Sequence, residues 1–219
     1  MPANSIEFVD RAVEPEVRGF LHSPAVPKHA GIVLSHGAGS SAHAPLLIAL
    51  AETFCAFGFS VLRCDLPYRQ ARSFGPPGPG DAARDRAGLK NAVAALKKDN
   101  ATVYLGGHSY GGRQSSMLCA EEPDLVAGLL LLSYPLHPPR KPEQQRTQHL
   151  PDLRTPALFV SGTRDPFGSI EELERAIKMI PAKTKLLAIE GAGHDLGFKG
   201  KAKEDLTQKI LSAFSFLSP

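Results

Sequence analysis

Apolar residues gather in short continuous runs that recur along the chain. Runs of this kind are typical of strands that are buried on both faces of a parallel sheet. They predict strands at 31–35, 60–63, 102–105, 126–132, 157–160 and 185–189. Two earlier segments, 6–9 and 17–21, predict an antiparallel pair joined by a turn around Glu14-Pro15.

Between these runs, apolar residues recur at the spacing of one helix face. Four such stripes predict packed helices, with apolar positions Leu46, Leu47, Leu50 and Phe54; Leu89, Val93 and Leu96; Ile170, Leu173, Ile177 and Ile180; and Leu206, Ile210, Phe214 and Leu217. Ser169 and Glu172 have the spacing of a capping box at the start of the third stripe, and Pro181 marks its end.

The alternation of strands and helices predicts the fold class. We expect an α/β fold, with a mostly parallel twisted sheet of about 7–8 strands and helices on both faces. A chain of 219 residues fits one domain spanning 1–219. Ligands bind beyond the carboxyl ends of the strands in such sheets, so the loops that leave the strands should carry the functional residues.

Four of these loops hold reactive side chains. The loop after 31–35 reads Ser-His-Gly-Ala-Gly-Ser, and the loop after 102–105 contains Gly-His-Ser-Tyr-Gly-Gly. The loops after 157–160 and 185–189 contain Ser-Gly-Thr-Arg-Asp and Gly-Ala-Gly-His-Asp. Glycines two residues before and after Ser109 fit a strand-to-helix turn that has no room for a Cβ and exposes the serine hydroxyl. Ser109 is therefore a candidate nucleophile, although serine is also a preferred helix N-cap.

The ordered set of loops resembles the α/β-hydrolase family over nearly the whole chain. More narrowly, it is similar to the small, lidless branch of dienelactone hydrolase-like proteins, and to the hydrolase-like domain shared by testis-expressed protein 30 and a subunit of the nonspecific-lethal histone acetyltransferase complex. The resemblance implies a serine hydrolase that cleaves an ester or thioester of a small substrate without a cofactor or metal. The stretch 137–152 lies where larger members insert a lid domain, and it is too short to form one.

The order Ser109, Asp165, His194 matches the nucleophile, acid and base of this family. A serine hydroxyl is almost never ionised at neutral pH, so a base must take its proton, and His194 suits that task. Asp165 would orient the imidazole and stabilise its protonated form. Asp195, next to the histidine, and Asp65, after the strand at 60–63, are the alternatives for the acid.

The negative oxygen of the tetrahedral intermediate needs fixed hydrogen-bond donors. The backbone N–H of Tyr110 and, by family resemblance, that of Ala38 would form this oxyanion hole. We interpret His36 and His108 as structural residues that hold the loops.

Two side chains are candidates for substrate binding, Tyr68 and Phe167. Tyr68 lies in the segment 67–80, which is too rich in proline and glycine to predict regular structure. This segment leaves a strand on the side of the candidate site, where it would either cover the substrate pocket or serve as a solvated connector.

Charge and cysteine content exclude several classes of partner. The net charge of +3 is small and its cations are dispersed, which argues against nucleic acid. No apolar run is long enough for a membrane helix, and the first residues do not resemble a signal peptide. The three cysteines are interpreted as buried thiols in a reducing compartment, so the expected location is cytoplasmic. The oligomeric state stays open.

Two alternative functions remain at this stage. A triad enzyme of this kind could use peroxide as the acyl acceptor, or could cleave a peptide. The scaffold could also serve as a non-catalytic interaction domain, because hydrolase folds are used for binding as well.

Overall fold

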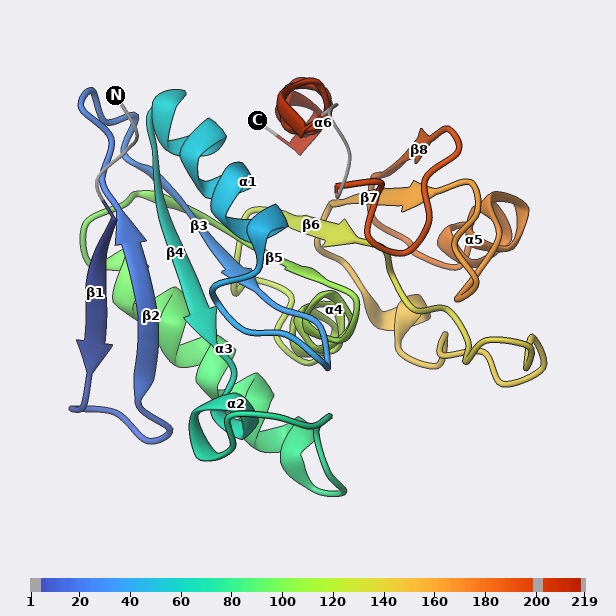
Figure 1. Cartoon of the computed structure of the whole chain (residues 1–219), viewed down its shortest axis with the longest axis horizontal. Coiled ribbons are helices and arrows are strands. Elements are labelled where there is room, and N and C mark those ends of the chain that lie inside the picture. Colours follow the sequence, from blue (N-terminus) through green and yellow to red (C-terminus); the bar gives the residue numbers. More distant parts are fainter. Residues whose placement is uncertain (1–4, 199–202, 218–219) are drawn as a thin grey trace.

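The computed structural model describes residues 5–198 and 203–217, so both ends of the predicted 1–219 domain and residues 199–202 lie outside the described residues. Within that part, eight strands form one sheet in the order β1-β2-β4-β3-β5-β6-β7-β8 (Figure 1). Their bounds are β1 (Ser5–Asp10), β2 (Val17–His22), β3 (Ala30–Ser35), β4 (Phe59–Asp65), β5 (Thr102–His108), β6 (Leu129–Leu132), β7 (Ala157–Gly162) and β8 (Thr184–Ile189). Strand β2 runs antiparallel to β1 and β4, and the other pairs are parallel. The predicted fold class is confirmed.

Helices cover both faces of the sheet. They are α1 (Pro45–Ala56), α2 (Pro67–Ala71), α3 (Asp81–Lys97), α4 (Tyr110–Glu121), α5 (Ile170–Ile177) and α6 (Lys203–Phe214), with 3₁₀ turns at Leu150–Asp152 and Ser215–Leu217. Helices α1 and α6 pack on one face, and α3, α4 and α5 pack on the other (Figure 1). Side chains of β3 alternate between the two cores, with Ile32 and Leu34 facing α1 and Val33 facing α3.

The structure differs from the sequence prediction at several element boundaries. The fourth predicted helix ends at Phe214, and Leu217 lies in the 3₁₀ turn that follows. The predicted strand 126–132 is shortened to β6, because β7 starts after Pro156 and offers no ladder partner before Leu129. The third helix has the predicted capping box between Ser169 and Glu172, but it ends at Ile177, and Ile180 is buried in the turn that follows.

The segment 67–80 was expected to lack regular structure, and that expectation is wrong for its first residues. Helix α2 begins with Pro67 at a position where the missing N–H costs nothing and the fixed φ favours a helix. The stretch 72–80 that follows is irregular.

In the described part of the chain, no helix is both long enough and apolar enough to cross a membrane.

Candidate active site

Ser109 occupies a strained turn between β5 and α4. Its φ is 52° and its ψ is −115°, a conformation that L-residues rarely adopt and that is typical of functional sites. A Cβ at Gly107 would lie 2.4 Å from Ser35 Oγ, and one at Gly111 would lie 2.6 Å from His36 O. The two glycines are therefore required by close packing against the end of β3. The Ser109 side chain makes no capping hydrogen bond to α4, which disfavours the interpretation as an ordinary N-cap.

The structure brings three predicted site residues into one hydrogen-bonded chain. His194 Nε2 lies 2.8 Å from Ser109 Oγ, and His194 Nδ1 lies 2.8 Å from Asp165 Oδ2. A carboxylate accepts and does not donate, so Nδ1 carries the proton and Nε2 is free to accept the one from serine. Asp165 is 7% exposed and is held in place by the N–H of Phe167, which donates to Oδ1 over 2.9 Å.

The two alternative acids have other partners. Asp195 Oδ1 accepts a hydrogen bond from Gly197 N, and Asp65 Oδ1 accepts one from Ala42 N. Among the described residues, the carboxylate within hydrogen-bond distance of His194 is that of Asp165. The geometry therefore favours Asp165 as the orienting acid.

Two rings flank the candidate base. Phe167 lies 4.2 Å from the His194 ring, centroid to centroid, with a 30° angle between the ring planes. His108 Nε2 donates to His194 O over 2.8 Å, and burial lowers the pKa of His108. Phe167 thus lies beside the reacting groups, as a substrate-binding role would require, whereas His108 contacts the backbone of the base.

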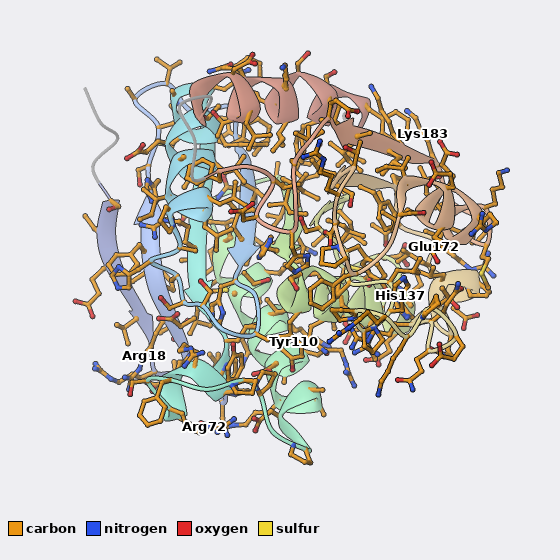
Figure 2. The ribbon with its side chains drawn as sticks, turned by 45° about the vertical axis from the view of Figure 1, so that its right-hand side comes forward. Arg18, Arg72, Tyr110, His137, Glu172 and Lys183 are labelled. Carbon is orange, nitrogen blue, oxygen red and sulfur yellow. The ribbon has the colours of Figure 1, made fainter. Side chains whose placement is uncertain are left out.

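The loop that carries Asp165 and Phe167 is attached to the loop that follows β6. His137 N donates to Phe167 O over 3.0 Å, and His137 Nε2 lies 3.3 Å from Glu172 Oε2. Figure 2 shows Tyr110 between this side of the molecule, marked by His137 and Glu172, and the opposite side, marked by Arg72.

The loop after β3 lies on the other side of Ser109. A Cβ at Gly37 would lie 3.4 Å from Ser109 Cβ, so the loop passes directly beside the candidate nucleophile. Across the described residues, the backbone N–H groups of Ala38 and Tyr110 have no hydrogen-bond acceptor. Tyr110 N also starts α4, where the helix dipole favours negative charge. Both predicted oxyanion donors are therefore available to a ligand.

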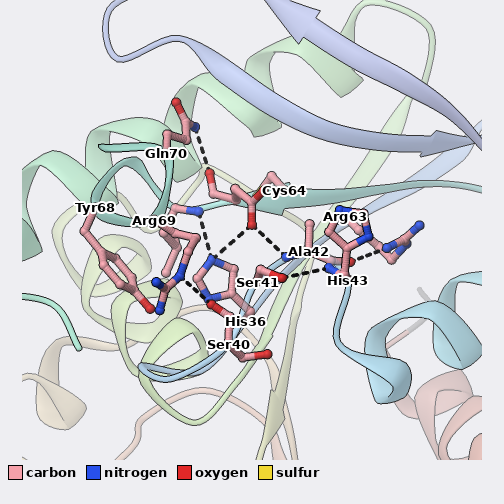
Figure 3. Close-up of polar contacts among 12 residues, drawn as sticks. His36, Ser40, Ser41, Ala42, His43, Arg63, Cys64, Tyr68, Arg69 and Gln70 are labelled. Carbon is pink, nitrogen blue, oxygen red and sulfur yellow. Dashed lines mark hydrogen bonds and ion pairs between the residues drawn. The ribbon is translucent and has the colours of Figure 1, made fainter. Parts of the chain in front are cut away.

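A buried polar network supports this loop from beneath (Figure 3). His36 Nε2 accepts from Leu66 N over 3.1 Å, so its Nδ1 carries the proton and donates to Gly37 O over 2.9 Å. Burial lowers the pKa of His36, which favours this neutral form. Asp65 Oδ1 accepts the N–H of Ala42 over 2.7 Å further along the loop.

Two arginines bind carbonyl groups of the same loop, and no sequence pattern predicts this role for either. Arg69 Nε donates to Ser40 O over 2.7 Å (Figure 3). Its Nη2 donates to Gly75 O over 2.8 Å. Arg63 donates to Ala42 O and to His22 Nε2. Neither residue belongs to a recognisable motif.

Tyr68 does not occupy the position expected of a substrate-binding residue. It is 2% exposed, and its hydroxyl donates to the carbonyls of Gly37 and Ala38 at 3.1 and 2.8 Å. The polar atom of Tyr68 is thus engaged by the loop and is not directed towards a ligand, which disfavours direct contact with substrate.

Two hollows border the loop after β3. The first is a cavity of about 240 Å³ beside Gly37 and His108, with apolar walls formed by Ala44, Pro45, Leu46, Leu47 and Phe198. The second is a polar hollow between Ser40, Arg69 and the irregular stretch that contains Phe74 and Gly75. Part of the segment 67–80 therefore lines a hollow beside this loop, and its role in covering the substrate pocket stays a prediction.

The three cysteines are free and buried, as predicted. Burial raises the pKa of Cys55, and raises the pKa of Cys64 and Cys119 to about 12. Within the described residues, no group of three or more His, Cys, Asp or Glu side chains is arranged to hold a metal ion.

Comparison with known proteins identifies the family. The model of the alpha/beta hydrolase domain family matches residues 28–218, so the chain belongs to that family. The predicted resemblance is thereby confirmed. Membership supports an enzyme of the hydrolase class.

Solved structures with the same fold include one serine hydrolase without a lid. A dienelactone hydrolase from Anabaena variabilis matches with a TM-score of 0.76 and 20% identity over 98% of both chains. A serine hydrolase without a lid from Xanthomonas campestris matches with a TM-score of 0.73 and 16% identity, over 98% of this chain and 95% of the other. A serine hydrolase homologue from Coxiella burnetii matches with a TM-score of 0.74 and 16% identity, over 97% of this chain and 98% of the other. At these identities, the similarity shows the fold.

Proposed function

We propose that the protein is a serine hydrolase that cleaves a carboxylic ester or thioester of a small substrate through an acyl-serine intermediate on Ser109. The observation that carries this proposal is the hydrogen-bonded chain from Ser109 through His194 to Asp165. A strained serine, a base within reach and a buried acid behind it form the arrangement that activates an alcohol for attack on a carbonyl.

Acylation begins when His194 Nε2 takes the proton of Ser109 and the serine Oγ bonds to the carbonyl carbon of the substrate. The carbonyl oxygen becomes an anion and accepts hydrogen bonds from the N–H groups of Ala38 and Tyr110. As the intermediate collapses, the bond to the leaving oxygen or sulfur breaks. The imidazolium returns its proton to that leaving group, and the acyl group stays on Ser109.

Deacylation repeats these steps with water as the nucleophile. His194 takes a proton from water, the hydroxide oxygen bonds to the acyl carbon, and the bond to Ser109 Oγ breaks as the serine regains its proton. The products are a carboxylic acid and free enzyme. Every proton moves between Ser109, His194, the substrate and water, so the reaction requires no cofactor.

The apolar cavity beside Gly37 supports a role in binding the acyl group of the substrate. Its walls are mostly apolar, with Ser40, His108 and Asp195 among the lining residues, and it reaches the loop whose N–H groups would hold the carbonyl oxygen. At about 240 Å³ it suits a small group, because ligand pockets for drug-sized molecules span roughly 300–1,000 Å³. We therefore expect a short apolar acyl chain.

A cytoplasmic location remains the prediction from the sequence.

A fluorophosphonate probe tests the proposal, because it labels an activated serine. We expect the wild-type protein to be labelled, Ser109→Ala to be unlabelled, and Ser116→Ala, a buried serine on the same helix, to keep its label. p-Nitrophenyl esters of increasing acyl length, assayed beside amide and peroxide substrates, then identify the reaction. An unlabelled wild type, or equal labelling of Ser109→Ala, would contradict the proposal, and a stable protein partner without turnover would favour an interaction domain.

A further inference from the structure

A buried carboxylate lies behind the candidate oxyanion hole and takes no part in the proton transfers described above. Asp85, on α3, is 0% exposed. Its two oxygens accept hydrogen bonds from two separate elements: Oδ1 from Tyr68 N over 3.0 Å, and Oδ2 from the Tyr110 hydroxyl over 2.7 Å. Tyr110 carries one of the two backbone donors that would hold the oxyanion, and the Tyr68 hydroxyl contacts the loop that carries the other.

The first connection is through Tyr110. Its backbone N–H is one candidate donor, and its side chain is anchored at Asp85. The residue follows Ser109, whose φ of 52° leaves the start of α4 in a strained conformation. A fixed ring at Tyr110 therefore restricts rotation of the peptide that presents the N–H beside the nucleophile.

The second connection runs through Tyr68 to Ala38. The Tyr68 hydroxyl shares its one proton between Gly37 O, at 3.1 Å, and Ala38 O, at 2.8 Å. In a trans peptide the carbonyl and the N–H point in opposite directions, so holding Gly37 O towards Tyr68 turns the N–H of Ala38 away from it. The Tyr68 hydroxyl is thus one of three donors to Gly37 O, with His36 Nδ1 and Ser40 N, that together orient the peptide of the second candidate donor.

The packing around Asp85 makes the two connections rigid. The rings of Tyr68 and Tyr110 meet edge to face, with centroids 5.8 Å apart. A Cβ at Gly88 would lie 2.6 Å from Pro67 Cγ, so α2 and α3 are in direct contact at this point. Burial raises the pKa of Asp85, because a charged carboxylate is destabilised away from water. An apolar side chain would fill the same space without burying a polar group. A carboxyl group is suited to the position because it accepts from two donors at once.

We propose that Asp85 is a positioning residue that fixes both halves of the oxyanion hole, acting on the Tyr110 N–H directly and on the Ala38 N–H through the Tyr68 hydroxyl. This inference rests on the proposed serine hydrolase function. It predicts that loss of either tyrosine hydroxyl weakens stabilisation of the transition state while substrate binding is retained.

Tyr68→Phe and Tyr110→Phe remove one hydroxyl each and leave the ring and backbone in place. Tyr134→Phe is the matched control, because Tyr134 is also buried and its hydroxyl donates to a backbone carbonyl, Arg146 O, over 2.7 Å. We expect kcat on a p-nitrophenyl ester to fall about tenfold or more in the first two variants, with KM changed less than about twofold. The loss should stay below the roughly 10²–10³-fold cost of removing a donor outright. The control should keep its kcat.

A second measurement separates positioning from a general loss of structure. A trifluoromethyl ketone forms an anionic adduct on serine, and its affinity should fall by the same factor as kcat in Tyr68→Phe and Tyr110→Phe. The affinity of the matched methyl ketone, which binds as a neutral carbonyl, should be the same in these variants as in the wild type. Asp85→Asn keeps one acceptor oxygen and replaces the other by a donor, so it should show the same selective loss.

The outcomes distinguish this inference from the function on which it rests. If the wild type neither hydrolyses an ester nor forms the ketone adduct, the proposed function fails and the positioning role fails with it. If the wild type is active and both tyrosine variants keep their kcat, the positioning role alone is overturned. Equal losses for the two ketones, or an equal loss of kcat in Tyr134→Phe, would also overturn it, because they would indicate a general structural effect.

Discussion

The two sides of Ser109 are built differently. On one side, Asp165 and His194 reach the serine through side-chain contacts from the loops after β7 and β8. On the other side, the groups next to the serine are backbone N–H groups, and side chains such as Tyr68 and Arg69 hold their loop from behind. On the first side, each functional group is linked to the next by side-chain hydrogen bonds in one chain. On the second side, several independent hydrogen bonds hold the same loop.

This difference predicts how activity responds to substitutions on each side. A chain of single contacts fails when one member is removed, because no other group in it can transfer the proton. A network of several hydrogen bonds loses precision in steps, because the remaining bonds still hold the loop near its position. We therefore expect abrupt losses on the side of His194 and graded losses on the side of Ala38.

The largest loss should follow His194→Ala, which removes the proposed base. We expect kcat to fall by about 10⁶, as for the equivalent residue in other serine hydrolases. Stopped-flow and long-time ester assays would measure both variant and wild type. A residual rate within tenfold of the wild type would show that another group carries the proton.

Asp165→Asn should have the next largest effect, with kcat reduced by about 10⁴, because an amide at this position favours the wrong tautomer of His194. Asp195→Asn, which alters the neighbouring carboxylate, should reduce kcat less than about tenfold. The same ester assay compares the two. If their effects were reversed, Asp195 would be the orienting acid.

The support of the loop after β3 should also make stability sensitive to acid, through His22. Burial lowers the pKa of His22 to about 4, and His22 Nε2 accepts from Arg63, which holds the loop at Ala42. As the pH falls from about 6.5 towards 4, the unfolded chain binds a proton that the folded chain does not, so stability falls over this window by up to about 3 kcal/mol.

His22→Gln keeps an acceptor for Arg63 and removes this titration. Urea unfolding between pH 7 and pH 4 should show a shallower fall in stability for the variant than for the wild type. His149, whose pKa burial also lowers to about 4, stays in place and contributes the same slope to both proteins. Identical pH profiles would show that His22 does not contribute.

The smallest effect concerns the contact between α4 and the end of β3. Gly111→Ala places a methyl group 2.5 Å from Ser35 Oγ and so pushes α4 away from the loop after β3. We expect a loss of about 1–3 kcal/mol in unfolding free energy, typical of overpacking. Gly39→Ala, where no atom lies within 4 Å of the added methyl among the described residues, should change stability by less than about 0.5 kcal/mol. Equal effects would contradict the tight contact.

The same difference decides how much could be predicted from the sequence. The sheet, the helices and the positions of Ser109, Asp165 and His194 follow from apolar runs and from loops at strand ends, because reactive side chains have recognisable residue types. Backbone donors have no such signature. Tyr68, Arg69 and Asp85 lie in segments without a motif, and their roles depend on contacts between residues about 17 to 31 positions apart, which no local pattern records.

The proline-rich segment 67–80 shows the same limit in one place. Its composition correctly indicates an irregular stretch after residue 71, but it also suggests that the whole segment lacks order. The short helix α2 forms because Pro67 starts it and because α3 packs against it, and this packing depends on Gly88. Tertiary contact therefore overrides the local preference.

The buried cysteines have a practical consequence for enzymology. Thiolates, not thiols, react with electrophiles, and the raised pKa of Cys64 and Cys119 keeps both protonated in neutral buffer. An acylating or phosphonylating reagent applied to the folded protein should therefore spare them. Intact-mass measurement of the adduct would then give the fraction of molecules with a functional site. Measured rates could be normalised to that fraction.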